Sequence, residues 1–287
     1  VGVDENYLRN QLEKLHLKGY ELVVEKKLKM GIEGTRVSVQ LAHDQHNNHH
    51  HHAHHHHHEP HRNLDDINDI IDSSTLSESV KDRAKQMFLL IGKAEAKIHG
   101  KSLDEIHFHE VGAVDSIVDI VGAAICLDKL NVDKIMASRV EVGGGFVTCA
   151  HGTFPVPAPA TAEILLNIPI KKGTVDKETT TPTGASILAA NVNEFAHNPN
   201  IIIKKTGYGI GHRDLDIPNV LRVFLAETDE KPAQTTSMIT ECNIDDMNPE
   251  FYDFVMEILL NAGADDVFFV PVQMKKNRPA VKLSVIH

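Results

Sequence analysis

Long apolar runs and a secretory leader are both missing from the 287-residue sequence. No stretch approaches the roughly 20 consecutive apolar residues that a membrane-spanning helix needs. The first residues do not combine a charged start with an apolar segment, as a secretory signal would. We therefore expect a soluble, cytoplasmic protein with no membrane partner. Because 41% of the residues are hydrophobic, the chain can bury a sizeable core and a second, smaller unit.

Cysteine pairs are absent as well. The three cysteines, Cys126, Cys149 and Cys242, are far apart in the sequence, and none belongs to a CxxC motif. This spacing indicates neither a disulfide framework nor a cysteine-based zinc knuckle. We interpret all three as small core residues.

Positive charge is scarce, since 29 Lys and Arg face 40 Asp and Glu, for a net charge of -11. Nucleic-acid binding depends on clustered Lys and Arg that neutralise phosphates, so we expect no nucleic-acid partner. An anionic ligand must instead meet a local basic pocket. The acidic balance as a whole suits cations.

Histidine, by contrast, is abundant: the chain has 20, and twelve of them lie between His43 and His61. This segment has no apolar residue larger than Ala53, so it cannot bury a core, and we predict a disordered loop. Neutral imidazoles bind late first-row divalent ions, which suggests that the tract captures or buffers metal. A histidine-rich linker without a specific role is the alternative.

The hydrophobic periodicity predicts helices and strands in alternation. Helices are expected over 4–16, 64–71, 77–99, 114–130, 160–166, 185–192 and 249–262. Strands are expected over 20–29, 35–41, 136–147, 201–203, 220–226, 238–244, 267–272 and 281–286, with 201–203 buried. Between them, 154–159 is expected to be a rigid proline loop.

These elements predict an α+β protein with a mixed α/β main domain and a smaller, truncated, ferredoxin-like α+β unit. The expected divisions are 1–42 as the first part of the main domain, 43–62 as the disordered loop, 63–227 as the main domain with the metal and anion site, 228–236 as a linker, and 237–287 as an incomplete nucleotide-binding unit.

The strongest local constellation lies around Gly112. His107 and His109 share one face if 106–109 is extended, with Phe108 facing the core. Asp115 and Asp119 share a face of the following helix. Two imidazoles with carboxylates make a site suited to zinc, nickel, iron or manganese. The alternative is that the histidines are core or cap residues and that Asp115 serves the helix N-terminus.

Two segments could hold an anionic, phosphate-bearing ligand. The glycine-rich stretch 207–211, which includes Gly209, is predicted to be a turn, and Lys204, Lys205 and Arg213 supply charge. Thr180, Thr181 and Thr183 offer hydroxyls ahead of a helix. An ordinary tight turn and an N-cap cluster are the respective alternatives. His151 is a further candidate ligand or acid/base group, although a single histidine is more often structural.

An acidic strand end in the last segment is a candidate site for a metal ion carried by a nucleotide. It comprises Glu241, Asp245 and Asp246. A solvated strand end is the alternative interpretation.

Several phrases of the sequence, taken together and in order, resemble the LarC family. They are His107–Gly122 (HFHEVGAVDSIVDIVG), Val142–Gly145, Cys149–Gly152, Pro155–Thr161, Thr179–Ala185 and Thr206–Arg213. The histidine-rich insertion fits the same family. The resemblance covers nearly the whole chain, except that the family's N-terminal strand with its glycine- and aspartate-containing turn does not precede Val1, and its C-terminal nucleotide-binding part stops at His287.

The resemblance implies a nickel chelatase, a lyase that forms metal-carbon and metal-sulfur bonds. Ni²⁺ would be inserted into pyridinium-3,5-bisthiocarboxylic acid mononucleotide with the help of CTP and Mg²⁺ or Mn²⁺. The product would be the nickel-pincer nucleotide, with a lactate racemase-type apoenzyme as its acceptor. We also expect a homo-oligomer.

Residue chemistry, rather than the resemblance, assigns the roles within this reaction. His107, His109, Asp115 and Asp119 are the expected metal ligands, and Glu110 and His109 the expected catalytic groups. A nickel or zinc storage and delivery protein is the first alternative, because it needs only the histidine tract. A metal-dependent hydrolase that uses the same His and Asp cluster is the second.

Overall fold

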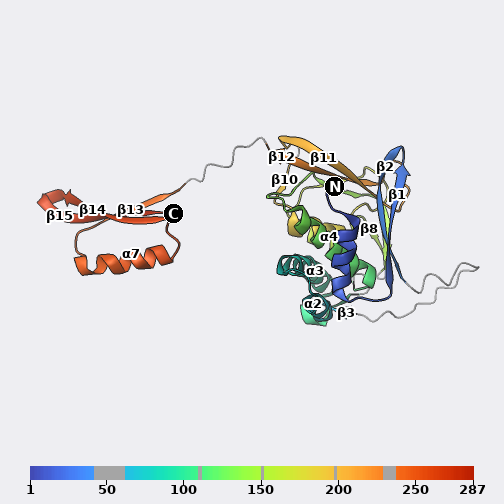
Figure 1. The fold of residues 1–287 in the computed structure, drawn as a ribbon, viewed down its shortest axis with the longest axis horizontal. Helices are drawn as coiled ribbons and strands as arrows, with labels where there is room; N and C mark the ends of the chain where they lie inside the picture. Colours follow the sequence, from blue (N-terminus) through green and yellow to red (C-terminus); the bar gives the residue numbers. More distant parts are fainter. Residues whose placement is uncertain (42–61, 109–111, 150–151, 197–198, 229–236) are drawn as a thin grey trace, which may run out of the picture. The chain divides into compact units, whose positions relative to one another are not determined.

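The computed structural model describes residues 1–41, 62–108, 112–149, 152–196, 199–228 and 237–287. The chain divides into two compact units, Val1–Glu227 and Thr228–His287. Both units combine helices with sheets, as Figure 1 shows, and this confirms the predicted α+β class. Within the described residues, no helix is both long and apolar enough to cross a membrane.

The helices of the larger unit gather around α3 (Glu78–His99) (Figure 1). Met87, Phe88 and Ile91 on α3 are fully buried. Helices α2, α4, α5 and α6 pack directly against α3, and α1 packs against α4. Their bounds are α1 Glu5–Leu12, α2 Leu64–Asp72, α4 Val114–Leu130, α5 Pro159–Ile164 and α6 Pro182–Asn191.

Helix α4 has the bounds that the sequence predicted, and it lies in the core. Ile117, Ile120 and Val121 are fully buried. Asp115 lies in the first turn of this helix. The buried side chains of α4 therefore hold the Asp115 backbone in place.

Local sequence signals explain where α2 and α3 begin and end. The Asn63 side chain accepts a hydrogen bond from the Asp66 backbone at 2.8 Å, and the Asp66 carboxylate accepts one from the Asn63 backbone at 2.9 Å. This capping box starts α2. Helix α3 ends at Gly100, whose φ of 61° is left-handed.

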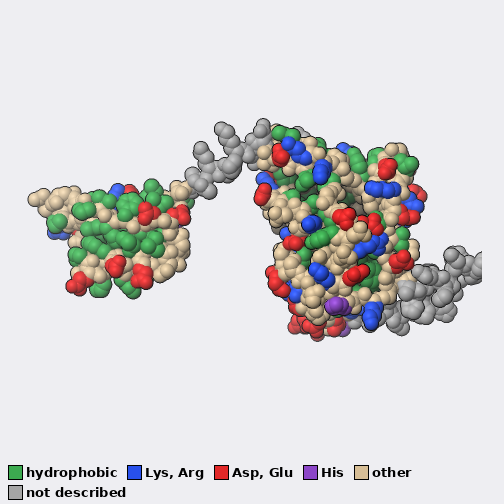
Figure 2. Space-filling model, viewed as in Figure 1, with side chains coloured by type: hydrophobic (Ala, Val, Ile, Leu, Met, Phe, Trp, Pro, Cys, Tyr) green, Lys and Arg blue, Asp and Glu red, His purple; other side chains and the backbone are tan. Residues whose placement is uncertain are grey.

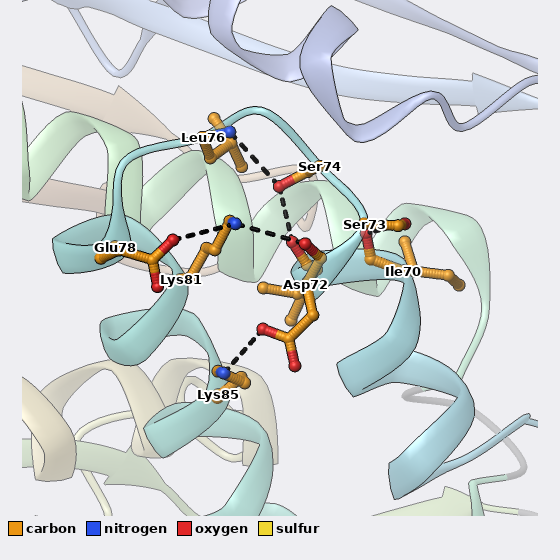
Figure 3. A network of polar contacts seen from close by, with 9 residues as sticks. Ile70, Asp72, Ser73, Ser74, Leu76, Glu78, Lys81 and Lys85 are labelled. Carbon is orange, nitrogen blue, oxygen red and sulfur yellow. Dashed lines mark hydrogen bonds and ion pairs between the residues drawn. The ribbon is translucent and has the colours of Figure 1, made fainter.

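Polar contacts hold the junction between α2 and α3 (Figure 3). The largely buried Lys81 donates to the Asp72 carbonyl at 3.2 Å and pairs with Glu78 at 3.1 Å. Lys85 pairs with the Asp72 carboxylate at 2.7 Å. Burial of an unpaired charge would raise the free energy of the folded state. The contacts with Asp72 and Glu78 therefore allow Lys81 to be largely buried between α2 and α3.

The main sheet has the order β1-β2-β11-β12. Strands β1 (Tyr20–Lys29) and β2 (Ile32–Leu41) form the predicted antiparallel hairpin, and β11 (Ile201–Ile210) runs parallel to β2. Strand β12 (Val220–Thr228) completes the sheet.

The glycine-rich stretch 207–211 is not the predicted turn, because β11 continues to Ile210. Close packing explains two of these glycines. A Cβ on Gly207 would lie 2.8 Å from the Val1 side chain, and a Cβ on Gly211 would lie 2.5 Å from the Asn219 side chain. Glycine here allows close approach of neighbouring atoms rather than reversal of the chain.

Two burial predictions are also wrong. Ile202 and Ile203 are 50% and 49% exposed, although 201–203 was expected to be a buried strand. Successive strand residues point to opposite faces, so neither face of β11 is covered here by the described residues. Cys242 is exposed on β13 (Ile239–Ile244), whereas Cys126 and Cys149 are partly buried.

The predicted strand over 136–147 is three short strands instead. They are β5 (Met136–Ala137), β6 (Val140–Gly143) and β7 (Phe146–Cys149). The break between β6 and β7 falls at Gly143 and Gly145, whose φ angles of 80° and 68° lie outside extended backbone. Ser138 and Arg139 separate β5 from β6. Each strand then pairs separately: β5 with β10 (Glu194–Phe195), β6 with β9 (Ile170–Lys172) and β7 with β8 (Gly152–Pro155).

The smaller unit contains β13 (Ile239–Ile244), the 3-10 turn η4 (Pro249–Phe251), α7 (Tyr252–Asn261), β14 (Asp266–Met274) and β15 (Arg278–Ile286). Its sheet order is β13-β15-β14, with β15 antiparallel to both neighbours. Strands β13 and β14 are therefore parallel and connected through α7, which is the split β-α-β arrangement expected from the sequence. Figure 2 shows hydrophobic side chains along this unit.

Candidate functional site

The segment around Gly112 is fixed at both of its described ends. Strand β4 (His107–Phe108) pairs with β3 (Arg62–Asn63), and the Arg62 guanidinium donates to the Gly112 carbonyl at 2.6 Å. A Cβ on Gly112 would lie 3.0 Å from the Phe108 carbonyl oxygen. Gly112, two residues before α4 begins, therefore lies against Phe108 of β4.

Phe108 is buried and His107 is exposed, which confirms the predicted alternation for these two residues. His107 therefore presents its imidazole at the surface. His109 and Glu110, the other two groups predicted from this phrase, lie outside the described residues. His151 and the histidine tract 43–61 lie outside them too.

Asp115 and Asp119 lie one turn apart on α4. The Asp115 carboxylate accepts a hydrogen bond from the Ser116 backbone at 2.7 Å. The Asp119 side chain as a whole is exposed, but neighbouring protein atoms partly desolvate its carboxyl group. This desolvation, together with the nearby charge of Asp115, raises the pKa of Asp119 to about 6. A divalent cation between the two carboxylates would relieve their repulsion.

The described part of the chain does not by itself complete a metal site. Outside 42–61, 109–111 and the other residues left undescribed, no three His, Cys, Asp or Glu side chains come together as a metal-binding group. His107, Asp115 and Asp119 alone do not make such a group. The predicted site therefore still depends on His109 and Glu110.

The threonines ahead of α6 have internal partners. Thr179 and Thr180 both donate their hydroxyl hydrogens to the Glu141 carbonyl, at 2.6 and 2.7 Å. The Thr181 hydroxyl caps α6 by accepting from the Gly184 backbone at 3.3 Å. Thr183 lies within the first turn of the helix, where its carbonyl accepts from Ser186. The hydroxyls of Thr179 and Thr180 thus fix this turn to β6, and the Thr181 hydroxyl caps α6.

The other predicted anion-binding residues are spread along β11 and the loop after it. Lys204 pairs with Glu227 across to β12 at 2.8 Å. Lys205 is exposed on the next position, and Gly209 is paired with Thr35 in the sheet. Arg213 alone reaches a pocket, where it donates to the Glu178 carbonyl at 2.8 Å.

This pocket has a volume of about 480 Å³. Three segments line it: the β7–β8 hairpin, the chain ahead of α6, and the loop after β11. Its lining residues are Phe146, Val147, Thr148, Lys177, Glu178, Arg213, Asp214 and Leu215. The volume falls within the roughly 300–1,000 Å³ typical of small-molecule sites.

The acidic strand end of the smaller unit is only partly open to a ligand. Lys282 and Ser284 both donate to the Glu241 carboxylate, at 2.8 and 2.9 Å. These hydrogen bonds lower the pKa of Glu241. Asp245 and Asp246 follow β13 and are exposed.

Comparison with known proteins assigns the whole chain to one family. The family model described as nickel insertion protein matches residues 1–287. The chain belongs to the nickel insertion protein family. No solved structure matches it.

Curated members of the family include close relatives of this chain. It is 58% identical to a protein of Clostridium kluyveri over 287 residues, which is all of this chain and 71% of that relative. It is also 58% identical to one of Clostridium acetobutylicum, over all of this chain and 73% of the relative. One from Desulfitobacterium hafniense is 48% identical over 99% of this chain and 69% of its own length. All three are named pyridinium-3,5-bisthiocarboxylic acid mononucleotide nickel insertion protein.

Sequence reasoning for this nickel insertion family member did not identify Phe146, Thr148 or Lys177. A signal for them existed in the glycine run 143–145. A Cβ on Gly143 would lie 1.8 Å from the Lys177 carbonyl oxygen, and a Cβ on Gly145 would lie 2.5 Å from the Asp176 carboxylate. The glycines thus mark a place where two backbones touch. They do not reveal which distant segment makes the contact.

Proposed function

We propose that this protein is a nickel chelatase that inserts Ni(II) into pyridinium-3,5-bisthiocarboxylic acid mononucleotide. The observation that supports this most strongly is 58% identity along the whole chain to relatives named for that reaction. A shared fold alone would be weak support, because one fold hosts many activities. An identity of 58% over all of this chain is stronger.

The reaction sets clear chemical demands. Ni(II), the substrate metal, forms bonds to sulfur and to a ring carbon, and the proton on that carbon must leave to a base. Imidazole and carboxylate groups can hold Ni(II) with exchangeable positions. We assign His107, His109, Asp115 and Asp119 to this role, with Glu110 or His109 as the base. Asp115 and Asp119 support the assignment because their mutual repulsion favours a cation.

Two finer parts of the proposal concern CTP and the product acceptor. We propose that the reaction depends on CTP with Mg²⁺ or Mn²⁺, that the smaller unit binds CTP, and that Glu241, Asp245 and Asp246 contribute to its metal site. Carboxylates are the usual ligands of such hard cations. The proposed acceptor of the nickel-containing nucleotide is a lactate racemase-type apoenzyme.

The test is a reaction of purified protein with Ni(II), CTP, Mg²⁺ and the thiolated nucleotide, followed by absorbance and mass. We expect a product that has gained nickel and lost protons, and none when CTP is omitted or replaced by ATP. Formation of product without CTP would contradict only the proposal that the reaction requires CTP. No product from any combination would contradict the chelatase proposal.

Metal storage is a second candidate, because twelve histidines lie within 43–61. Deletion of 43–61 separates the two functions. A chelatase without the tract should still form product at saturating Ni(II) and should slow only when Ni(II) is scarce. A storage protein should lose most of its bound nickel and should form no product with or without the tract.

A further inference from the structure

The pocket between the β7–β8 hairpin, the chain ahead of α6 and the loop after β11 combines a cationic lining with an exposed aromatic ring. Lys177 and Arg213 supply the charge, and Phe146 supplies the ring. Phe146 is 71% exposed, although it lines a pocket. An aromatic side chain in this position offers a free face for a planar ligand.

The acidic residues of the pocket are already matched with cations. Asp214 pairs with Lys29 at 2.5 Å, and this hydrogen bond, with the charge of Lys29, lowers the pKa of Asp214. Glu178 is buried, and its carboxylate lies 3.9 Å from the Arg213 guanidinium. Arg213 has five N–H donors, so its contacts with Glu178 leave others for a ligand.

Lys177 differs from these residues. Lys177 lines the pocket. Within the described ranges, its ammonium group forms no ion pair or side-chain hydrogen bond. The other charged residues of the pocket form ion pairs, whereas Lys177 is exposed. The pocket therefore has a local excess of positive charge. In a chain with a net charge of -11, such a site is where an anion would bind.

The backbone that carries these groups is tightly fixed. The Gly144 backbone donates to the Lys177 carbonyl at 3.3 Å, and the Gly145 carbonyl accepts from Val156 at 2.9 Å. On the other side, the Asn219 side chain donates to the Arg213 carbonyl at 3.0 Å. The pocket is therefore built by backbone contacts that do not depend on a ligand, so its groups are arranged in advance.

We infer that this pocket binds the pyridinium mononucleotide, with the pyridinium ring on Phe146 and the anionic groups at Lys177 and Arg213. The inference rests on the proposed function. The ligand named there has a cationic aromatic ring, two thiocarboxylates and a nucleotide phosphate. A cationic ring stacks favourably on an aromatic face, and Arg and Lys are the usual partners of carboxylate and phosphate groups.

The absence of tryptophan from the chain makes a direct test possible. Phe146→Trp places a single indole on the pocket wall. A pyridinium ring is an electron acceptor that quenches indole fluorescence on contact. Titration with the nickel-free thiolated nucleotide should quench this variant. Leu28→Trp is the matched control, because Leu28 is also 71% exposed, on the β1–β2 hairpin, and does not line the pocket.

Calorimetry with the same nickel-free nucleotide gives the second measurement. Phe146→Ala should weaken binding about 5-fold or more, and Lys177→Ala or Arg213→Ala about 10-fold each. Phe146→Tyr should restore most of the affinity. Lys18→Ala, an exposed lysine before β1, and Leu28→Ala should bind like the parent protein. Melting temperatures identify any variant that fails to fold.

The outcomes separate this inference from the proposed function. If the parent protein forms the nickel product while the Phe146, Lys177 and Arg213 variants bind the nucleotide normally, the pocket assignment is overturned and the chelatase proposal stands. If these variants lose binding as expected but no protein forms product, the pocket assignment stands and the chelatase proposal fails. No binding to the parent protein, or quenching by CTP rather than by the thiolated nucleotide, overturns the assignment.

Discussion

Asp119 carries a pKa of about 6, raised from 3.8 by desolvation and by the charge of Asp115. Between these two values the folded protein binds more protons than the unfolded chain does. Stability therefore falls as pH rises through this window, and the loss is complete above about pH 6. The carboxylate destabilises the folded protein at neutral pH, which is consistent with a group kept for binding a cation.

We expect Asp119→Asn to raise the urea midpoint at about pH 7.5 and to leave it unchanged below about pH 4. Unfolding curves across this range measure the difference. Asp133→Asn, in the loop after α4, is the control. A variant less stable than the parent at neutral pH would show that Asp119 makes a stabilising contact instead. Addition of Ni(II) should narrow the difference, because the metal stabilises only the parent carboxylate pair.

Gly143 is the residue on which the pocket wall depends. Its φ of 80° favours glycine, and a Cβ would collide with the Lys177 carbonyl. Gly143→Ala should therefore cost about 3 kcal/mol of stability or more and should displace Lys177. Thermal unfolding measures the first effect, and binding of the nickel-free nucleotide measures the second.

Gly173 provides the control, since its φ is 81° but a Cβ there would meet nothing within 4 Å. Gly173→Ala should cost only about 1–2 kcal/mol, the price of the left-handed backbone alone. Equal losses in the two variants would show that the contact with Lys177 does not matter.

For single residues, the sequence predicted where some candidate residues lie and missed others, for a physical reason. His107, Asp115 and Asp119 lie within one short phrase, where strand alternation and helix periodicity place side chains reliably. Lys177 meets Gly143 across the fold through backbone atoms, and no periodic pattern encodes such a contact. Arg213 was predicted for its charge, but its neighbours in the pocket were not.

Among the elements, β4 and α4 carry the proposed metal chemistry. His109→Ala should reduce nickel insertion by about 100-fold or more, because a ligand or base is lost. The rate of product formation at saturating Ni(II) measures the effect. His16→Asn is the control, since His16 is exposed with a φ of 55° that Asn tolerates. A His109→Ala protein with full activity would remove His109 from the site.

The elements themselves were largely predictable from periodicity. Helix α4 has the predicted bounds, and α3 and the β1–β2 hairpin differ by few residues. Two of the failures involve glycine. In 207–211, glycines that permit close packing were taken for a turn, and in 136–147 glycines with positive φ separate β6 from β7 within one expected strand. A glycine in the sequence indicates either a positive φ angle or a close contact of the backbone, but the sequence does not show which of the two applies.

On the scale of the whole molecule, the two units should be separable. The main hydrophobic core is formed entirely by residues of the larger unit. We therefore propose that a fragment of residues 1–227 unfolds cooperatively and binds the nickel-free nucleotide with the affinity of the longer chain. Circular dichroism and calorimetry test these two points. A fragment that folds but loses binding would show that the smaller unit contributes to the nucleotide site.

The same fragment should form no product if the smaller unit binds CTP, even with Ni(II), CTP and nucleotide present. Product formation by residues 1–227 would show that CTP binds elsewhere or is not needed. This outcome would leave both the pocket and the metal ligands in place.

The proposed activity of this protein is the placement of nickel in a pyridinium mononucleotide. Mass spectrometry of the nucleotide after incubation with the protein, Ni(II), CTP and Mg²⁺ detects this product. The parent protein should yield a species heavier by one nickel and lighter by the displaced protons, and His109→Ala should yield far less of it. A nucleotide of unchanged mass, recovered beside protein that has bound nickel, would contradict it.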